Sequence, residues 1–60
     1  MNLATLLIVD DEKSTRDGLR MALEDHFDCY LASGIKEAMA VLKSEPISIL
    51  LTDLRLSGES

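Results

Sequence analysis

The sequence predicts an α/β fold in which three parallel strands alternate with two helices. Residues 4–9 form a continuous apolar run, which is typical of a strand buried on both faces of a parallel sheet. Residues 47–52 form a second run that is mostly apolar and rich in β-branched side chains. Two segments with apolar residues at helical spacing lie between these runs, on either side of a third short apolar stretch. Strands and helices that alternate through short connections favour right-handed crossovers and a parallel sheet.

The first helix is predicted at about residues 14 to 26, after the strand at 4–9. Ser14 followed three residues later by Asp17 resembles a capping box, so Ser14 is the expected N-cap of this helix. The apolar residues of this segment share one side, and Arg16 falls on the other, polar side.

The second strand is predicted near residues 29–32, and a second helix follows it. Ser33 is the expected N-cap of that helix. Pro46 prevents the helix from continuing, because it lacks a backbone N–H and clashes with the preceding turn. The third strand then covers residues 47–52.

Composition narrows the class of protein. The chain has 60 residues, of which 47% are hydrophobic, so it forms one small domain at most. Its net charge of −5 argues against direct binding to nucleic acid, which needs a basic face. No apolar stretch is long enough to span a membrane, and the single Cys29 excludes an intrachain disulfide. We therefore expect a soluble, cytoplasmic protein with no membrane partner.

Acidic residues follow two of the predicted strands. Asp10 and Asp11 come directly after the first strand, and Asp53 comes directly after the third. Ligands of open α/β sheets bind outside the carboxyl ends of the strands. If these two strands are neighbours, three carboxylates converge, and such a cluster either raises some of their pKa values or binds a cation such as Mg²⁺. The simpler alternative is that Asp10 and Asp11 only stabilise the start of the following helix.

Two motifs carry a resemblance to a known family. Residues 6–12 (LLIVDDE) resemble the opening of the response-regulator receiver domain, and residues 49–58 (ILLTDLRLSG) resemble its phosphoacceptor segment. Residues 32–34 (ASG) resemble the start of its second helix. The resemblance covers residues 1–60 and implies a partial flavodoxin-like receiver fold with parallel sheet order 2-1-3. The wording of residues 52–56 (TDLRL) resembles regulators that activate transcription with an ATPase domain.

The resemblance also implies roles for individual residues. Asp53 would be the phosphoacceptor that takes a phosphoryl group from a sensor histidine kinase. Asp11 would ligate Mg²⁺ directly, Asp10 would act largely through metal-bound water, and the backbone carbonyl of Arg55 would add a further ligand beside Asp53. The chain would then be a signalling module rather than an enzyme, and it would pass its signal to an output domain.

The sequence departs from the family pattern in one place and stops short of others. Ser57 stands where the family usually has proline before the loop glycine, which loosens the turn without removing a ligand. The switch Ser or Thr and the lysine of the family lie on later strands, beyond Ser60. The resemblance therefore implies the N-terminal half of a receiver domain, with the later strands and helices absent.

One other function stays open, and two more do not fit the sequence. A receiver fragment could serve as a structural or assembly module without phosphotransfer. A phosphatase with an aspartate nucleophile would need a second acid two residues after Asp53, where Arg55 stands. A nucleotide-binding protein would need a glycine-rich phosphate loop, and the sequence has none.

The predicted sheet order leaves the outer edge of the third strand bare. An exposed apolar edge strand favours pairing with another chain. We therefore expect self-association through residues 47–52, most simply as a two-fold dimer.

Overall fold

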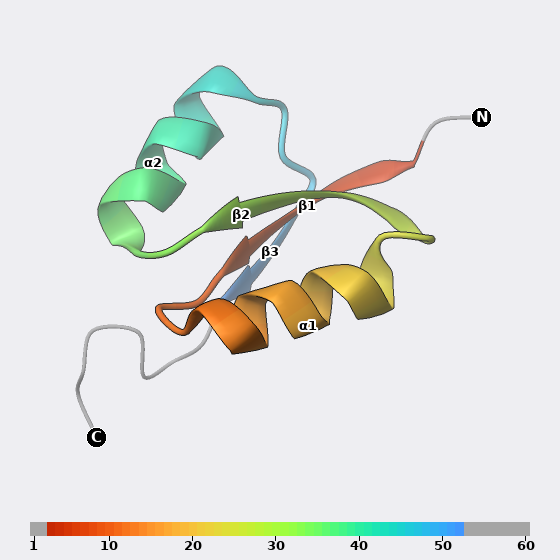
Figure 1. Cartoon of the computed structure of the whole chain (residues 1–60). Coiled ribbons are helices and arrows are strands. Elements are labelled where there is room, and N and C mark those ends of the chain that lie inside the picture. Colours follow the sequence, from red (N-terminus) through yellow and green to blue (C-terminus); the bar gives the residue numbers. More distant parts are fainter. Residues whose placement is uncertain (1–2, 53–60) are drawn as a thin grey trace.

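The computed structural model describes residues 3–52 and contains three strands and two helices in alternation (Figure 1). This order confirms the predicted α/β class. The elements are β1 (Ala4–Val9), α1 (Lys13–Leu23), β2 (Phe27–Ala32), α2 (Ile35–Ser44) and β3 (Ile49–Thr52).

The three strands form one parallel sheet in the order β2-β1-β3, as the resemblance implied for a partial flavodoxin-like fold. Val9, the last residue of β1, is aligned with Ala32 at the end of β2 and with Thr52 at the end of β3. The three carboxyl ends therefore meet at one edge of the sheet, which we call the carboxyl edge.

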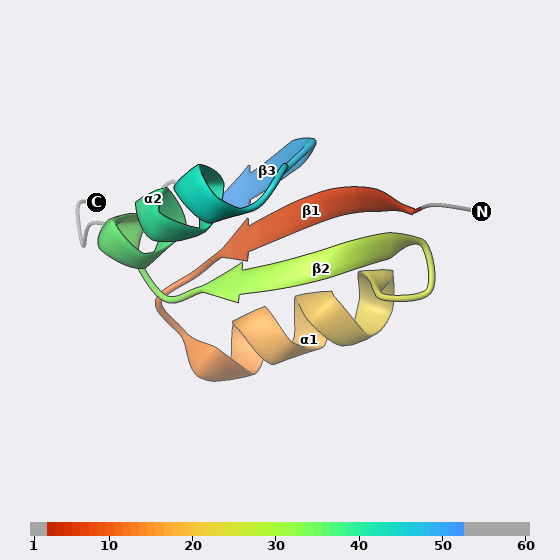
Figure 2. The same cartoon turned by 90° about the horizontal axis from the view of Figure 1, so that it is seen from above.

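The two helices lie on opposite faces of the sheet (Figures 1 and 2). This arrangement follows from the topology. The chain moves from β1 to β2 in one direction and from β2 past β1 to β3 in the other, so two right-handed crossovers place their helices on opposite sides.

β1 is the most deeply buried element. Leu6, Leu7, Ile8 and Val9 are at most 3% exposed, which explains why this strand is continuously apolar instead of alternating. One face of the sheet holds a core cluster that packs under α2; its members are Leu7, Val9, Ala32 and Ala38, with Tyr30, Val41 and Ile47 packed against them. By contrast, α1 has no buried residue of its own, although Leu6 and Ile8 on the opposite face of β1 are buried.

The start of α1 differs from the prediction. Glu12, in extended conformation, is the N-cap, and Ser14 lies inside the helix. Asp17 does not reach back to Ser14, because its carboxylate binds the Lys13 ammonium at 2.8 Å. The helix also ends earlier than predicted, at Leu23, where the backbone N–H of His26 donates to the Leu23 carbonyl and closes a turn.

The start of α2 and the two outer strands also differ in detail. Gly34 is the N-cap of α2, since the N–H and hydroxyl of Ser33 both donate to the side chain of Glu37 instead. β2 begins at Phe27, earlier than predicted. β3 begins at Ile49, and Ser48 before it already donates its N–H to the backbone of Thr5 in β1.

The core predicts a sharp difference between two apolar positions. Leu7→Ala should lower the free energy of unfolding by about 2–5 kcal/mol, because it removes a fully buried side chain and leaves a cavity in a small core. Met21→Ala, on the exposed side of α1 with 65% of the side chain accessible, is the control and should change stability little. Urea unfolding followed by circular dichroism measures both. Equal midpoints for the two variants would contradict this account of the core.

The edge of the sheet bears on the prediction of self-association. In the described part of the chain β3 pairs with β1 alone, and Ile49, Leu50 and Leu51 are 41%, 51% and 37% exposed. We expect the chain to form dimers as its concentration rises, and Leu50→Lys to shift the equilibrium towards monomer, because a charge on an edge strand opposes pairing. Met39→Lys, on α2 and equally exposed at 50%, is the control. Sedimentation equilibrium measures the monomer–dimer equilibrium of all three proteins. A wild type that stays monomeric at every concentration would contradict the prediction.

Candidate functional site

Asp10 continues the central strand at the carboxyl edge of the sheet. Its backbone N–H donates to the carbonyl of Ala32 in β2 at 3.1 Å, so the ladder between β1 and β2 extends by one bond beyond the last paired residues. The acidic residue is thereby held in register with the sheet, at the centre of the edge where ligands of parallel α/β sheets bind.

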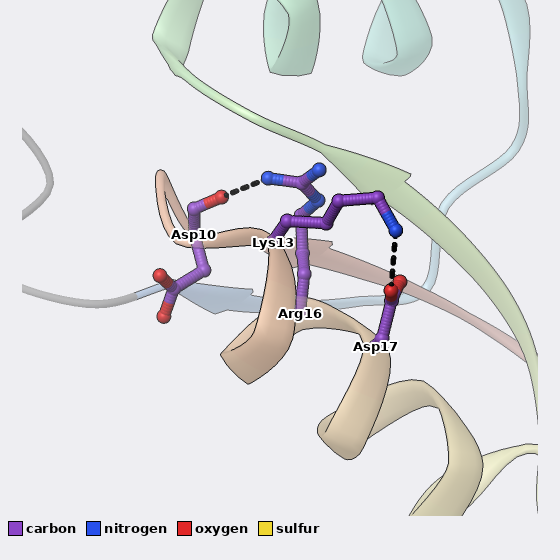
Figure 3. A network of polar contacts seen from close by, with 4 residues as sticks. All are labelled: Asp10, Lys13, Arg16 and Asp17. Carbon is purple, nitrogen blue, oxygen red and sulfur yellow. Dashed lines mark hydrogen bonds and ion pairs between the residues drawn. The ribbon is translucent and has the colours of Figure 1, made fainter.

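The Asp10 side chain is buried, with 5% of its surface exposed, and it is the buried charged residue among residues 3–52. Its Oδ1 atom accepts a hydrogen bond from the N–H of Glu12 at 2.9 Å. Its backbone carbonyl accepts a hydrogen bond from Nη1 of Arg16, also at 2.9 Å (Figure 3). Together with the bond to Ala32, these contacts hold the N–H, the carbonyl and the carboxylate of one residue. A buried charge needs such partners to offset the loss of water.

The remaining predicted site residues are only partly in view. Asp11 follows Asp10 at the carboxyl edge, and its side chain is exposed. Asp53 and Arg55 lie outside the described residues. Thr52, which precedes Asp53 in the sequence, is the partner of Val9, which precedes Asp10. Within residues 3–52 no three acidic, histidine or cysteine side chains come together as metal ligands, so the convergence of all three aspartates stays a prediction.

A second polar group lies where β2 leads into α2. Oε1 of Glu37 accepts hydrogen bonds from the backbone N–H and the hydroxyl of Ser33, at 2.6 and 2.9 Å. These bonds hold the pKa of Glu37 below its ordinary value of 4.5, and the positive charge of Arg16 lowers it further. The guanidinium of Arg16 therefore acts on α2 as well as on the loop after β1.

The hydrogen bond from Arg16 to Asp10 was not predicted from the sequence. The helical pattern places it on the polar side of α1, which suggests a solvated charge. In the structure it is half-buried, and its side chain runs back over the loop to Asp10. Side chains in helices lean towards the N-terminus, so an arginine in the second turn of a helix can reach the strand end that precedes it. An arginine six residues after the first acid is the signal that could have found it.

The other two basic residues of α1 form exposed ion pairs. Lys13 pairs with Asp17 and is 79% exposed, and this hydrogen bond lowers the pKa of Asp17 below its ordinary value (Figure 3). Arg20 pairs with Glu24 at 2.8 Å on the surface. Exposed pairs of this kind add little to stability. Within the described part of the chain, Arg16 is thus the cation whose side chain hydrogen-bonds to Asp10.

Comparisons with known proteins agree with the resemblance seen in the sequence. The hydrogenase transcriptional regulatory protein HoxA of Cupriavidus necator is 42% identical over 55 residues, which are 92% of this chain and 11% of HoxA. The response regulator PilR of Pseudomonas aeruginosa is 39% identical over 61 aligned positions, covering 100% of this chain and 14% of PilR. An NtrX-like response regulator of Rickettsia bellii is 34% identical over 59 residues, 97% of this chain and 12% of that protein. No family model and no solved structure matches.

The βαβαβ fold with an acidic pair at its carboxyl edge, together with these relatives, shows that the chain is similar to response regulators and forms a receiver-domain segment. The chain spans between 11% and 14% of the length of these relatives. Neither helix in residues 3–52 has the length and apolar character needed to cross a membrane.

The Ser33–Glu37 contact predicts a pH dependence. Because the folded pKa of Glu37 is lowered, the stability it contributes is fully present above its unfolded value near 4.5 and is lost as the pH falls through the lower folded value. Glu37→Gln should therefore flatten the loss of stability in this acidic range. Ser33→Ala removes the hydroxyl donor and keeps the N–H donor, so its profile should lie between the two. Urea unfolding at a series of pH values tests this, and parallel profiles for wild type and Glu37→Gln would contradict it.

Proposed function

We propose that this chain is the phosphoacceptor part of a response regulator, and that Asp53 takes a phosphoryl group from a sensor histidine kinase with the help of Mg²⁺. The observation that carries the proposal is the fixation of Asp10. This acid is buried at the end of the central strand and is held through its N–H, its carbonyl and its carboxylate. Val9, the residue before Asp10, is paired in the sheet with Thr52, the residue before Asp53 in the sequence.

The donor set fits a hard divalent cation. Asp10 and Asp11 supply carboxylate oxygens at the carboxyl edge, and Asp53 and the backbone carbonyl of Arg55 complete the proposed ligands. Oxygen ligands with retained waters are what Mg²⁺ prefers. The bound cation would offset the repulsion between carboxylate and phosphoryl oxygens. The rigid placement of Asp10 supports this role, because ligands held in advance lose little freedom on binding.

The proposed transfer needs no base at Asp53. A carboxylate is ionised near neutral pH, so it can attack as it stands. One oxygen of Asp53 forms a bond to phosphorus while the bond between phosphorus and the kinase histidine nitrogen breaks. The electron pair returns to the imidazole, which takes up a proton. The product is an aspartyl phosphate, and the chain acts as substrate and catalyst of its own modification instead of turning over a separate substrate.

The partners follow from this role. A histidine kinase would supply the phosphoryl group, and an output domain in the longer protein would receive the signal. The names of the relatives, two of which are called response regulators and one a transcriptional regulatory protein, support a transcriptional output. Direct contact of this acidic segment with nucleic acid is not part of the proposal. The cytoplasmic location stays a prediction.

A second candidate is a structural or assembly module that does not transfer phosphate. The exposed apolar side chains of β3 favour it, because they offer an edge for pairing. In that case the acids at the carboxyl edge would serve only the start of α1, and they would bind no cation.

A titration with Mn²⁺ in place of Mg²⁺ separates the two candidates. We expect paramagnetic broadening of amide signals to be confined to the neighbourhoods of Asp10, Asp11 and Asp53, and to weaken in Asp53→Ala. Asp28→Ala is the matched control, because Asp28 is an exposed acid at the opposite end of β2 and its loss changes the net charge equally. Broadening without localisation, in a folded sample, would favour the structural module.

The phosphoacceptor is tested on the same samples. Incubation with acetyl phosphate and Mg²⁺ should add one phosphoryl group, seen as a gain in intact mass, and Asp53→Asn should abolish the gain. A gain that persists in Asp53→Asn would show that another residue is modified, and it would contradict the assignment.

A further inference from the structure

We propose that Arg16 is a positioning residue for the acidic pair. Its guanidinium would hold the peptide between Asp10 and Asp11 in the orientation that directs both carboxylates to the cation. This inference deepens the proposed function and rests on it, and it adds to the site a residue outside the four proposed ligands.

The contact joins the helix to the backbone rather than to the acid. Nη1 of Arg16 donates to the carbonyl oxygen of Asp10 at 2.9 Å in a partly buried setting. Figure 3 shows the guanidinium on the carbonyl side of Asp10, while the carboxylate points away from it. The Asp10 carboxylate instead accepts a hydrogen bond from the N–H of Glu12. Arg16 therefore restrains the residue without neutralising its side chain through a direct ion pair.

The restraint extends to Asp11 through the geometry of the peptide bond. The Asp10 carbonyl and the Asp11 N–H lie in one plane, so fixing the carbonyl also fixes the position of the Asp11 Cα. The Asp11 side chain is exposed, and its direction depends strongly on this backbone. The bond from the Asp10 N–H to Ala32 holds the other side of the residue. The hydrogen bond from the Arg16 side chain therefore holds the carbonyl side of Asp10, while the bond to Ala32 holds its N–H side.

The alternative is that Arg16 only balances charge at an acidic edge. Its charge does act over a distance, because it lowers the pKa of both Glu37 and Asp17. The two roles predict opposite signs for cation binding. Removing a positive charge near carboxylates strengthens divalent binding if charge alone matters, since repulsion of the incoming cation is relieved. Removing a positioning residue weakens binding, as loss of a group that orients metal ligands generally does.

The experiment compares Arg16→Met with Arg20→Met in the 60-residue chain. Both variants lose one positive charge from α1, but Arg20 pairs with Glu24 on the surface and, within residues 3–52, forms no hydrogen bond to Asp10 or Asp11. Positioning predicts that Arg16→Met weakens Mn²⁺ binding about tenfold, at the low end of such effects, while Arg20→Met leaves it unchanged or slightly tighter. Arg16→Lys keeps the charge and a group that can donate hydrogen bonds, so its Mn²⁺ affinity should fall between those of wild type and Arg16→Met. Unchanged or tighter binding in a folded Arg16→Met would overturn the inference.

A metal-free measurement separates this inference from the proposed function. The amide of Glu12 donates to the Asp10 carboxylate, so its hydrogen exchange reports the order of the loop. Exchange should be faster in Arg16→Met and unchanged in Arg20→Met. If the wild type binds no Mn²⁺ at the acids, the metal site fails, and exchange alone decides whether Arg16 orders the loop. If Arg16→Met does not fold, Arg16→Lys replaces it. Positioning predicts that the Glu12 amide then exchanges faster than in wild type, and charge balance predicts an unchanged exchange rate.

Discussion

The pairing of β1 on both of its edges, combined with burial of both of its faces, is the constraint on which the described structure depends. Over residues 6–9 the strand exposes neither its backbone nor its side chains, so these four residues must be apolar. The first residue after it that carries a charge, Asp10, is still buried and therefore needs polar partners. The loop after β1 and the second turn of α1 supply two of them, and β2 supplies the third.

The sequence was most informative where one physical requirement dominated. Continuous apolar character identified β1, and the alternation of strand and helical periods identified the fold class. Helix ends were less predictable, because several polar residues compete for them. Ser14 offered a cap that the structure does not use, since the chain had already turned at Glu12. Ser33 is likewise occupied by Glu37, which leaves Gly34 as the cap.

The positions of Asp10 and Asp11 in the candidate site were predictable from the sequence, whereas the contact made by Arg16 was not. Asp10 and Asp11 stand out because they follow a buried strand, whereas the pattern of α1 assigns Arg16 to the solvent side. A periodic pattern reports where the Cβ of a residue points, but a long side chain can carry its charged end to another element. The hydrogen bond from Arg16 to a backbone carbonyl therefore required coordinates.

The three hydrogen-bond partners of Asp10 described above all precede β3 in the sequence. Ala32, Glu12 and Arg16 belong to the first strand–helix–strand unit, and β3 contributes none of these bonds. The contacts with Glu12 and Arg16 have a short sequence separation, and such contacts form early and at low entropic cost. As the chain emerges during synthesis, these three partners are therefore made before β3 is. β3 then pairs with the second edge of β1, on which the burial of that strand depends.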